Sequence, residues 1–115
     1  MKLSPRNRII DKQQYDELIT HLKKLTDFMI DNGNPLVQDQ TRVLIFHIRP
    51  ILNRIFEVNP HSKEIKIRDI SETEFYILRH YLDVLFTMAQ HYHMAKGLIS
   101  NARCAFKSVV ILNFR

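Results

Sequence analysis

The sequence contains few of the residues that interrupt helices or cross-link a fold. Its two glycines and four prolines are too few for a turn-rich all-β protein. The one cysteine, Cys104, excludes an intramolecular disulfide and suits a reducing compartment. No apolar run approaches the roughly 18 residues of a membrane span, and the N-terminus lacks the apolar core of a signal peptide. These absences predict a cytoplasmic protein, or a nuclear one in a eukaryotic source, without membrane contact.

Acidic residues are missing from both ends of the chain. Residues 1–10 and 84–115 contain no Asp or Glu, and the net charge is +5. The basic residues of these segments are Lys2, Arg6, Arg8, Lys96, Arg103, Lys107 and Arg115. Such asymmetry favours contact with a phosphate backbone or an acidic protein. The alternative is a solvated surface with a mildly basic bias.

The pattern that is present is helical, and its longest stretch covers residues 71–97. Ser71 and Glu74 form a capping box at its start, and Gly97 is expected to close it as a left-handed cap. The apolar residues fall on two stripes that together cover about half of the circumference. The stripes are Phe75, Leu78, Leu82, Leu85, Ala89 and Tyr92, and Ile77, Tyr81, Val84, Met88 and Ala95. We therefore predict a central helix over 71–96 with neighbours on more than one side.

Two further helices are predicted before it, after a basic arm at residues 1–10. The first covers 11–32, begins with an Asp11–Gln14 capping box and ends at Gly33. The second follows Asn34, extends to about residue 58 and has Leu36 on its core face. Pro50 lies inside this helix and predicts a kink, or alternatively a full break.

Residues 59–70 are the only convincing interruption. Ile65 and Ile67 alternate with charged residues, which indicates either a strand without an obvious partner or a loop whose isoleucines enter the core. We favour the loop. A last helix is predicted over 98–115, although the β-branched residues of 108–112 also suit an extended tail. The apolar C-terminus requires burial in the core or in a homodimer contact. Four helices with short connections predict a single all-α domain, residues 1–115, built as a bundle.

No metal site or cofactor is expected. His91 and His93 are two residues apart, so on a helix they point in nearly opposite directions and cannot bind one ion together. No histidine pair has the i, i+4 spacing of helical zinc ligands. The sequence also has no glycine-rich phosphate loop, no nucleophile elbow and no paired acidic motif, which argues against an enzyme.

One short pattern is similar to an enzyme signature. Residues 42–47 form R-x4-H, which resembles the R-x4–6-H motif of HEPN-type ribonucleases, helical bundles that usually dimerise around it. The resemblance covers six residues. It implies that Arg42 would stabilise phosphate charge and that His47 would act as acid or base on an RNA phosphodiester. The sequence departs from the family at Val43, where a polar residue is usual, and at the nearby Pro50.

The outer face of the second helix carries an aromatic residue between arginines. Arg42, Phe46, Arg49 and Asn53 fall on one stripe outside the apolar arc. Such composition is enriched in binding hot spots and also suits base stacking. The alternative is that Phe46 packs beneath the first helix or the arm. Phe86 is similarly placed on the central helix, facing either a fourth helix or a partner.

These observations favour a small non-enzymatic interaction protein, acting as a regulator, adaptor or inhibitor by binding a partner protein through this stripe. The alternative is a nucleic-acid-binding protein that uses the helix-two arginines and the basic termini, namely Arg6, Arg8, Arg103 and Lys107. No helix-turn-helix spacing supports that alternative. A homodimer remains open.

Overall fold

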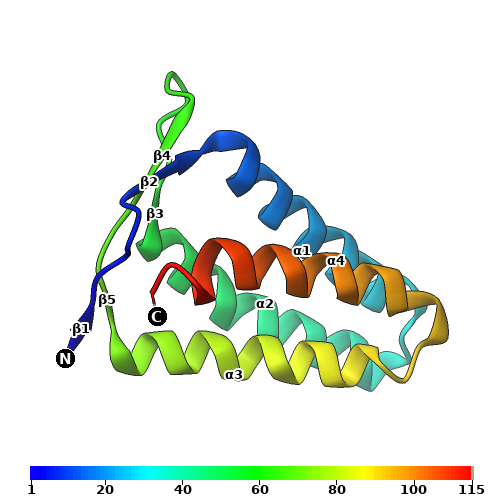
Figure 1. The fold of residues 1–115 in the computed structure, drawn as a ribbon. Coiled ribbons are helices and arrows are strands. Elements are labelled where there is room, and N and C mark those ends of the chain that lie inside the picture. The colour runs from blue at the N-terminus through cyan, green and yellow to red at the C-terminus, as the bar shows by residue number, and fades with distance from the viewer. Residues whose placement is uncertain (115) are drawn as a thin grey trace.

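Four α-helices carry most of the structure (Figure 1), which is a computed structural model describing residues 1–114. They are α1 (Lys12–Asn32), α2 (Pro35–Ile55), α3 (Glu72–Ala89) and α4 (Lys96–Phe106). A 3-10 turn, η1 (His93–Ala95), precedes α4, and a π-helical turn, η2 (Lys107–Ile111), continues it. The predicted helical fold with about four helices is confirmed.

The first helix and its connection follow the sequence closely. The backbone N–H of Asp11 donates to Gln14 Oε1 at 3.3 Å, which is one half of the predicted capping box. The helix buries its heptad residues Leu18, Leu22, Leu25 and Met29. After Gly33, the Asn34 side chain accepts a hydrogen bond from the N–H of Val37 at 2.9 Å and so caps α2.

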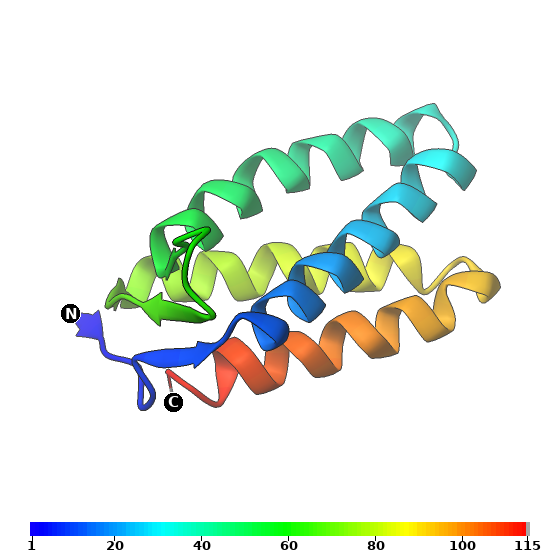
Figure 2. The same cartoon turned by 90° about the horizontal axis from the view of Figure 1, so that it is seen from above.

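The second helix continues through Pro50, so the full break is not what the structure shows. It ends at Ile55, earlier than predicted, because the next two residues form a strand. Leu36 was expected in the core, but its side chain is 65% exposed. The first turn of α2 lies at the end of the molecule, beside the α1–α2 connection (Figure 2).

The central helix is shorter than predicted, because α3 ends at Ala89 rather than near residue 96. The chain then turns, and Gly97 lies in the first turn of α4 instead of capping α3. Burial explains the reversal. Ile99, Ala102 and Phe106 are buried, which requires α4 to fold back along the bundle, where it packs beside α1 and α3. Phe86 is buried, with the Arg103 guanidinium of α4 at 5.2 Å from its ring centroid.

The buried part of the circumference of α3 is also smaller than predicted. The first stripe is buried through Ala89. In the second stripe Ile77 and Val84 are exposed, because α2 and α4 cover only two sides of the helix.

Short antiparallel strands at one end correct the prediction of an all-α fold. In a three-stranded sheet β2 (Ile9–Asp11) and β3 (Phe56–Glu57) flank β4 (Glu64–Ile67). A second pair joins β1 (Lys2–Leu3) to β5 (Ile70–Ser71). The favoured loop at 64–68 is therefore wrong. Ile65 and Ile67 do enter the core, but as alternate residues of a strand.

The C-terminal segment stays helical through η2 and is then fixed to the N-terminal arm. Val109, Val110 and Phe114 are buried, which confirms burial within the chain itself. The Asn113 side chain accepts a hydrogen bond from the Asn7 N–H at 2.8 Å and donates one to the Asn7 carbonyl at 3.1 Å. The Asn113 carbonyl accepts a third, from the Arg6 N–H at 2.7 Å. The last residue of the predicted helix, Arg115, lies outside the described residues.

Candidate functional site

A groove between α1 and α2 is lined mainly by apolar side chains. The two helices meet at their connection and diverge toward the strands, and α3 lies behind the gap (Figure 2). The hollow has a volume of about 480 Å³. Leu82 and Leu85 of α3 form its floor, between Leu22 of α1 and Leu52 of α2. We call it the α1–α2 groove.

The rim of this groove is polar and carries both signs of charge. Lys23 and Asp27 on α1 form an ion pair at 2.8 Å. On the opposite side lie Arg49 and Asn53, two members of the stripe predicted from the sequence. Within residues 1–114, Arg49 has no ion pair or hydrogen bond through its side chain. A full positive charge therefore stands beside an apolar hollow without a counter-charge from the protein.

The remaining stripe residues lie next to the groove. Phe46 is 75% exposed, so the alternative in which it packs beneath another element is wrong. Arg42, Phe46 and Arg49 line a second hollow of about 450 Å³, together with Ile45 and Pro50. Because Ile45 and Arg49 also line the α1–α2 groove, the two hollows form one continuous surface.

The two residues of the ribonuclease-like motif make contacts with different neighbours. Arg42 forms an ion pair with Asp39 at 3.3 Å on its own helix. The His47 ring stacks on Tyr81 of α3, with centroids 5.1 Å apart and planes 12° from parallel. Residues five apart on a helix point about 140° apart. The structure therefore does not bring these two side chains to a common point.

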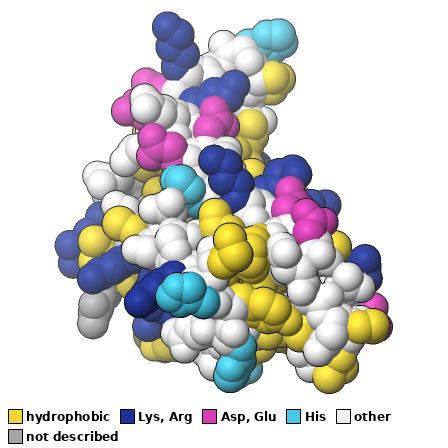
Figure 3. Space-filling model, turned by 90° about the vertical axis from the view of Figure 1, so that its right-hand side faces the viewer, with side chains coloured by type: hydrophobic (Ala, Val, Ile, Leu, Met, Phe, Trp, Pro, Cys, Tyr) yellow, Lys and Arg dark blue, Asp and Glu magenta, His cyan; other side chains and the backbone are white. Residues whose placement is uncertain are grey.

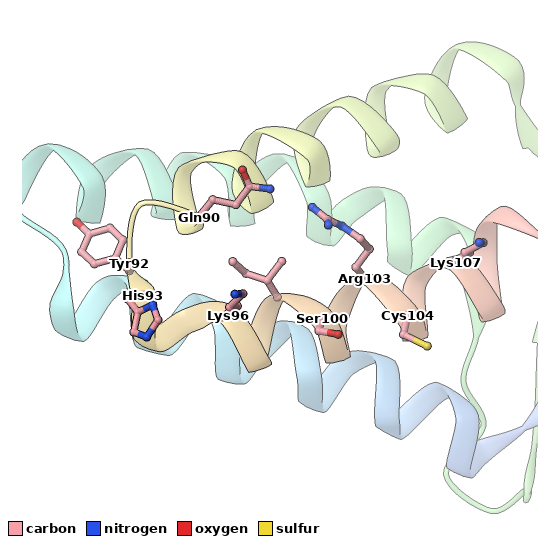
Figure 4. A pocket seen from close by; sticks show the side chains of 9 residues that line it. Gln90, Tyr92, His93, Lys96, Ser100, Arg103, Cys104 and Lys107 are labelled. Carbon is pink, nitrogen blue, oxygen red and sulfur yellow. The ribbon is translucent and has the colours of Figure 1, made fainter.

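The four residues of the predicted nucleic-acid site are divided between two places. Arg103 and Lys107 line a cleft of about 670 Å³ along α4 (Figure 4). Arg8 instead forms an ion pair with Asp69 at 3.0 Å, and Arg6 joins the C-terminal segment through its backbone. The sequence reasoning missed Lys96 in this cleft. The signal was the spacing of Lys96, Arg103 and Lys107, which places them on one face of a helix that begins at Lys96.

A further apolar area lies at the end of the molecule that carries the two helix connections. Figure 3 faces this end and shows hydrophobic side chains in a band bordered by histidines. Met94 is 82% exposed there, and the rings of Phe28 and Tyr92 meet edge to face at 6.3 Å.

One titratable group in the α1–α2 groove departs from its ordinary behaviour. Burial raises the pKa of the Tyr15 phenol above its usual value, and the nearby Asp16 carboxylate adds to the effect. The ring contacts Phe56 edge to face at 5.2 Å. Tyr15 therefore stays neutral at physiological pH and acts as part of the apolar wall.

Metal-binding groups do not gather on the described surface. Among residues 1–114 no three side chains of His, Cys, Asp or Glu are placed to hold an ion. No helix in the described part of the chain has the length and apolarity that crossing a membrane requires. Comparisons with protein-family models, with curated proteins and with solved structures find no match to this chain.

Proposed function

We propose that this protein is a small non-enzymatic interaction protein that binds an amphipathic helix of a partner protein in the α1–α2 groove. The observation that carries the proposal is the continuity of the groove with the exposed Phe46 and the unpaired Arg49. Acting by occupying a partner's surface, such a protein would serve as a regulator, adaptor or inhibitor.

The chemistry of the groove suits a helix. An amphipathic helix places one apolar face in a hydrophobic groove, with anchors at i, i+3, i+4 and i+7. Leu82 and Leu85 offer the floor for these anchors. Exposed aromatic residues and arginines contribute most of the binding energy in many interfaces, so Phe46 and Arg49 are the expected hot spots.

Charge identifies the kind of helix that would bind. Arg49 has no ion-pair partner among the described residues, and Arg42 beside it forms an ion pair with the exposed Asp39. A partner helix that carries Asp or Glu beside its apolar face would pair with Arg49 and be steered by the net positive charge. We therefore expect an acidic amphipathic segment.

Two further features belong to this proposal. Pro50 lies inside α2, and we expect a kink there, since proline removes one backbone hydrogen bond and crowds the Phe46 carbonyl. The cytoplasm is the compartment we propose. Cys104 is exposed and forms no disulfide within the described chain, which suits a reducing environment.

A site-specific cross-link tests the proposal in the native host. A photoreactive phenylalanine analogue replaces Phe46, and a matched control places it at Tyr76, an exposed aromatic position on α3 outside both hollows. We expect a protein adduct from position 46 that survives nuclease treatment and is lost when Arg49→Ala is added. Arg79→Ala, an exposed arginine on α3, should leave the adduct intact.

Several results would contradict this function. They are adducts of equal yield from both positions, adducts removed by nuclease, and adducts to a second copy of this chain alone. The last result would assign the groove to a homodimer contact. Phe46→Ala should leave the melting temperature nearly unchanged, because the exposed side chain gains little from folding.

A further inference from the structure

The cleft along α4 is separate from the α1–α2 groove and has a different chemical character. It opens beside α4 and the turn that follows α3, and its polar side chains lie along the helix in Figure 4. We call it the basic cleft. Its lining consists of Gln90, Tyr92, His93, Lys96, Ile99, Ser100, Arg103, Cys104 and Lys107.

The cations of the basic cleft have no counter-charge. Lys96, Arg103 and Lys107 are exposed, and in the described structure none of them forms an ion pair. Among the other arginines that the structure describes, Arg8, Arg42 and Arg54 each pair with an acid, whereas Arg49 does not. The difference arises in the sequence, because no Asp or Glu follows position 83.

One of these cations is also held in place. The Arg103 guanidinium lies 5.2 Å from the centroid of the Phe86 ring, which is itself buried. A cation over an aromatic face is attracted by the ring quadrupole. The group is therefore oriented in the cleft before any ligand arrives, which lowers the entropic cost of binding an anion.

The spacing of the cations selects the length of the ligand. Lys96 and Lys107 are eleven residues apart, or roughly 16 Å along a helix at 1.5 Å per residue. Seven residues separate Lys96 from Arg103 and four separate Arg103 from Lys107, so the three fall on one face. A single phosphate can meet only one or two of these charges. A chain of phosphates can meet all three.

The other lining groups favour a single strand over a duplex. Tyr92 and His93 place two rings at one end of the cleft, and Ile99 is a buried apolar residue of its lining (Figure 4). Exposed bases stack on such rings, whereas paired bases do not offer their faces. The helix α4 lies along α1 and α3 and does not project as a recognition helix would for a duplex groove.

We propose that the basic cleft binds single-stranded nucleic acid, with Lys96, Arg103 and Lys107 on successive phosphates and the Tyr92–His93 end against a base. This site is independent of the proposed protein-binding groove. A protein with both would bring a partner protein to a nucleic-acid strand.

Fluorescence anisotropy with a labelled oligouridylate of fifteen nucleotides, used as the probe, tests the proposal on the full chain. Three phosphate contacts on a single strand give a slope of about −2 in log affinity against log salt. Affinity should therefore fall roughly 20-fold between 50 and 200 mM salt. Replacing Lys96, Arg103 and Lys107 together by Gln should abolish this salt-dependent binding.

A matched variant replaces Lys2, Lys63 and Lys66 by Gln, which removes the same charge from exposed positions on or beside the strands. It should retain binding within a few-fold. Melting temperatures of both variants check that each is folded, and single Lys107→Gln and Arg103→Lys variants give graded losses if the triple variant is unstable.

The proposal is overturned by any of four results. The first is no binding at 50 mM salt, and the second is equal loss in the two triple variants. The third is equal competition by inorganic phosphate or uridine monophosphate at matched phosphate concentration, which would indicate a single-anion site. The fourth is equal or tighter binding of duplex DNA or polyglutamate, which would remove the part assigned to exposed bases.

Discussion

Substituting Gly97 by alanine should stabilise the protein, and the sign of this effect tests the course of the chain after α3. Gly97 lies in the first turn of α4, and a Cβ atom added there meets nothing within 4 Å. Its φ angle is not positive, so alanine adopts the same backbone without strain. Alanine also restricts the unfolded chain more than glycine does.

The expected gain is about 0.4–1 kcal/mol in the free energy of unfolding, the usual range where glycine is replaced at a compatible position. For a chain of this length that corresponds to about 2–5 °C in melting temperature. Urea denaturation followed by circular dichroism measures the free energy, and a thermal scan measures the temperature.

Gly33→Ala is the matched comparison and should have the opposite sign. A Cβ at Gly33 would lie 2.5 Å from the Met29 carbonyl oxygen and 2.6 Å from Val37 Cγ1. Because the carbonyl is backbone, relief requires movement of the α1–α2 connection. We expect a loss of about 1–3 kcal/mol, typical of overpacking.

A destabilised Gly97→Ala variant would refute this reasoning. A left-handed cap at Gly97, as the sequence pattern suggested, would make alanine unfavourable by about 1–2 kcal/mol. The two arrangements therefore predict changes of opposite sign in the free energy of unfolding.

Three further substitutions test other parts of the structure. Asn113→Ala removes two side-chain hydrogen bonds to Asn7 and should lower the free energy of unfolding in urea by about 2 kcal/mol. Asn101→Ala, on the exposed face of α4, should leave it unchanged. Equal effects of the two substitutions would contradict the link between the chain ends. Ile67→Ala should lower the free energy of unfolding by about 2–4 kcal/mol in the same assay, because it leaves a cavity at a core position of β4. A loss below about 0.5 kcal/mol would contradict the burial of Ile67. The raised pKa of Tyr15 implies a contribution to stability that is complete below pH 10 and is lost as the pH rises through the folded-state pKa. The Tyr15→Phe variant should therefore show a smaller fall in the urea midpoint between pH 9 and pH 11 than the parent protein. Parallel curves for the two proteins would contradict this prediction.

Local signals predicted where the first three helices start, because capping depends on residues three positions apart. Asp11 with Gln14 and Asn34 with Val37 form the expected contacts. The sheet could not be predicted in this way. The partners of β4 lie at the N-terminus and at the end of α2, and neither segment shows an isolated strand pattern long enough to be recognised.

The end of α3 escaped prediction for a related reason. Residues 90–92 contain neither Gly nor Pro, and the reversal follows from tertiary packing of α4 on α1 rather than from a local breaker. The sequence pattern places the end of the central helix at Gly97, whereas this glycine lies in the first turn of α4.

The candidate surfaces were predictable in part. The exposure of Phe46 followed from its place outside the apolar arc of its helix, and Arg103 and Lys107 stood out as cations in a segment without acids. The α1–α2 groove was not predictable, since its floor is supplied by α3 and depends on the angle at which two other helices diverge. Lys96 escapes prediction because the sequence pattern places it at the end of a helix, whereas it begins one in the structure.

The pairing of β2 with β4 sets a condition on the order in which the molecule can assemble during synthesis. Residues 9–11 leave the ribosome before their hydrogen-bonding partners at 64–66, which follow more than fifty residues later. The hairpin of α1 and α2 can therefore form early, before β2 can pair with β4. Closure of the sheet is a late, non-local event that we expect to limit the folding rate.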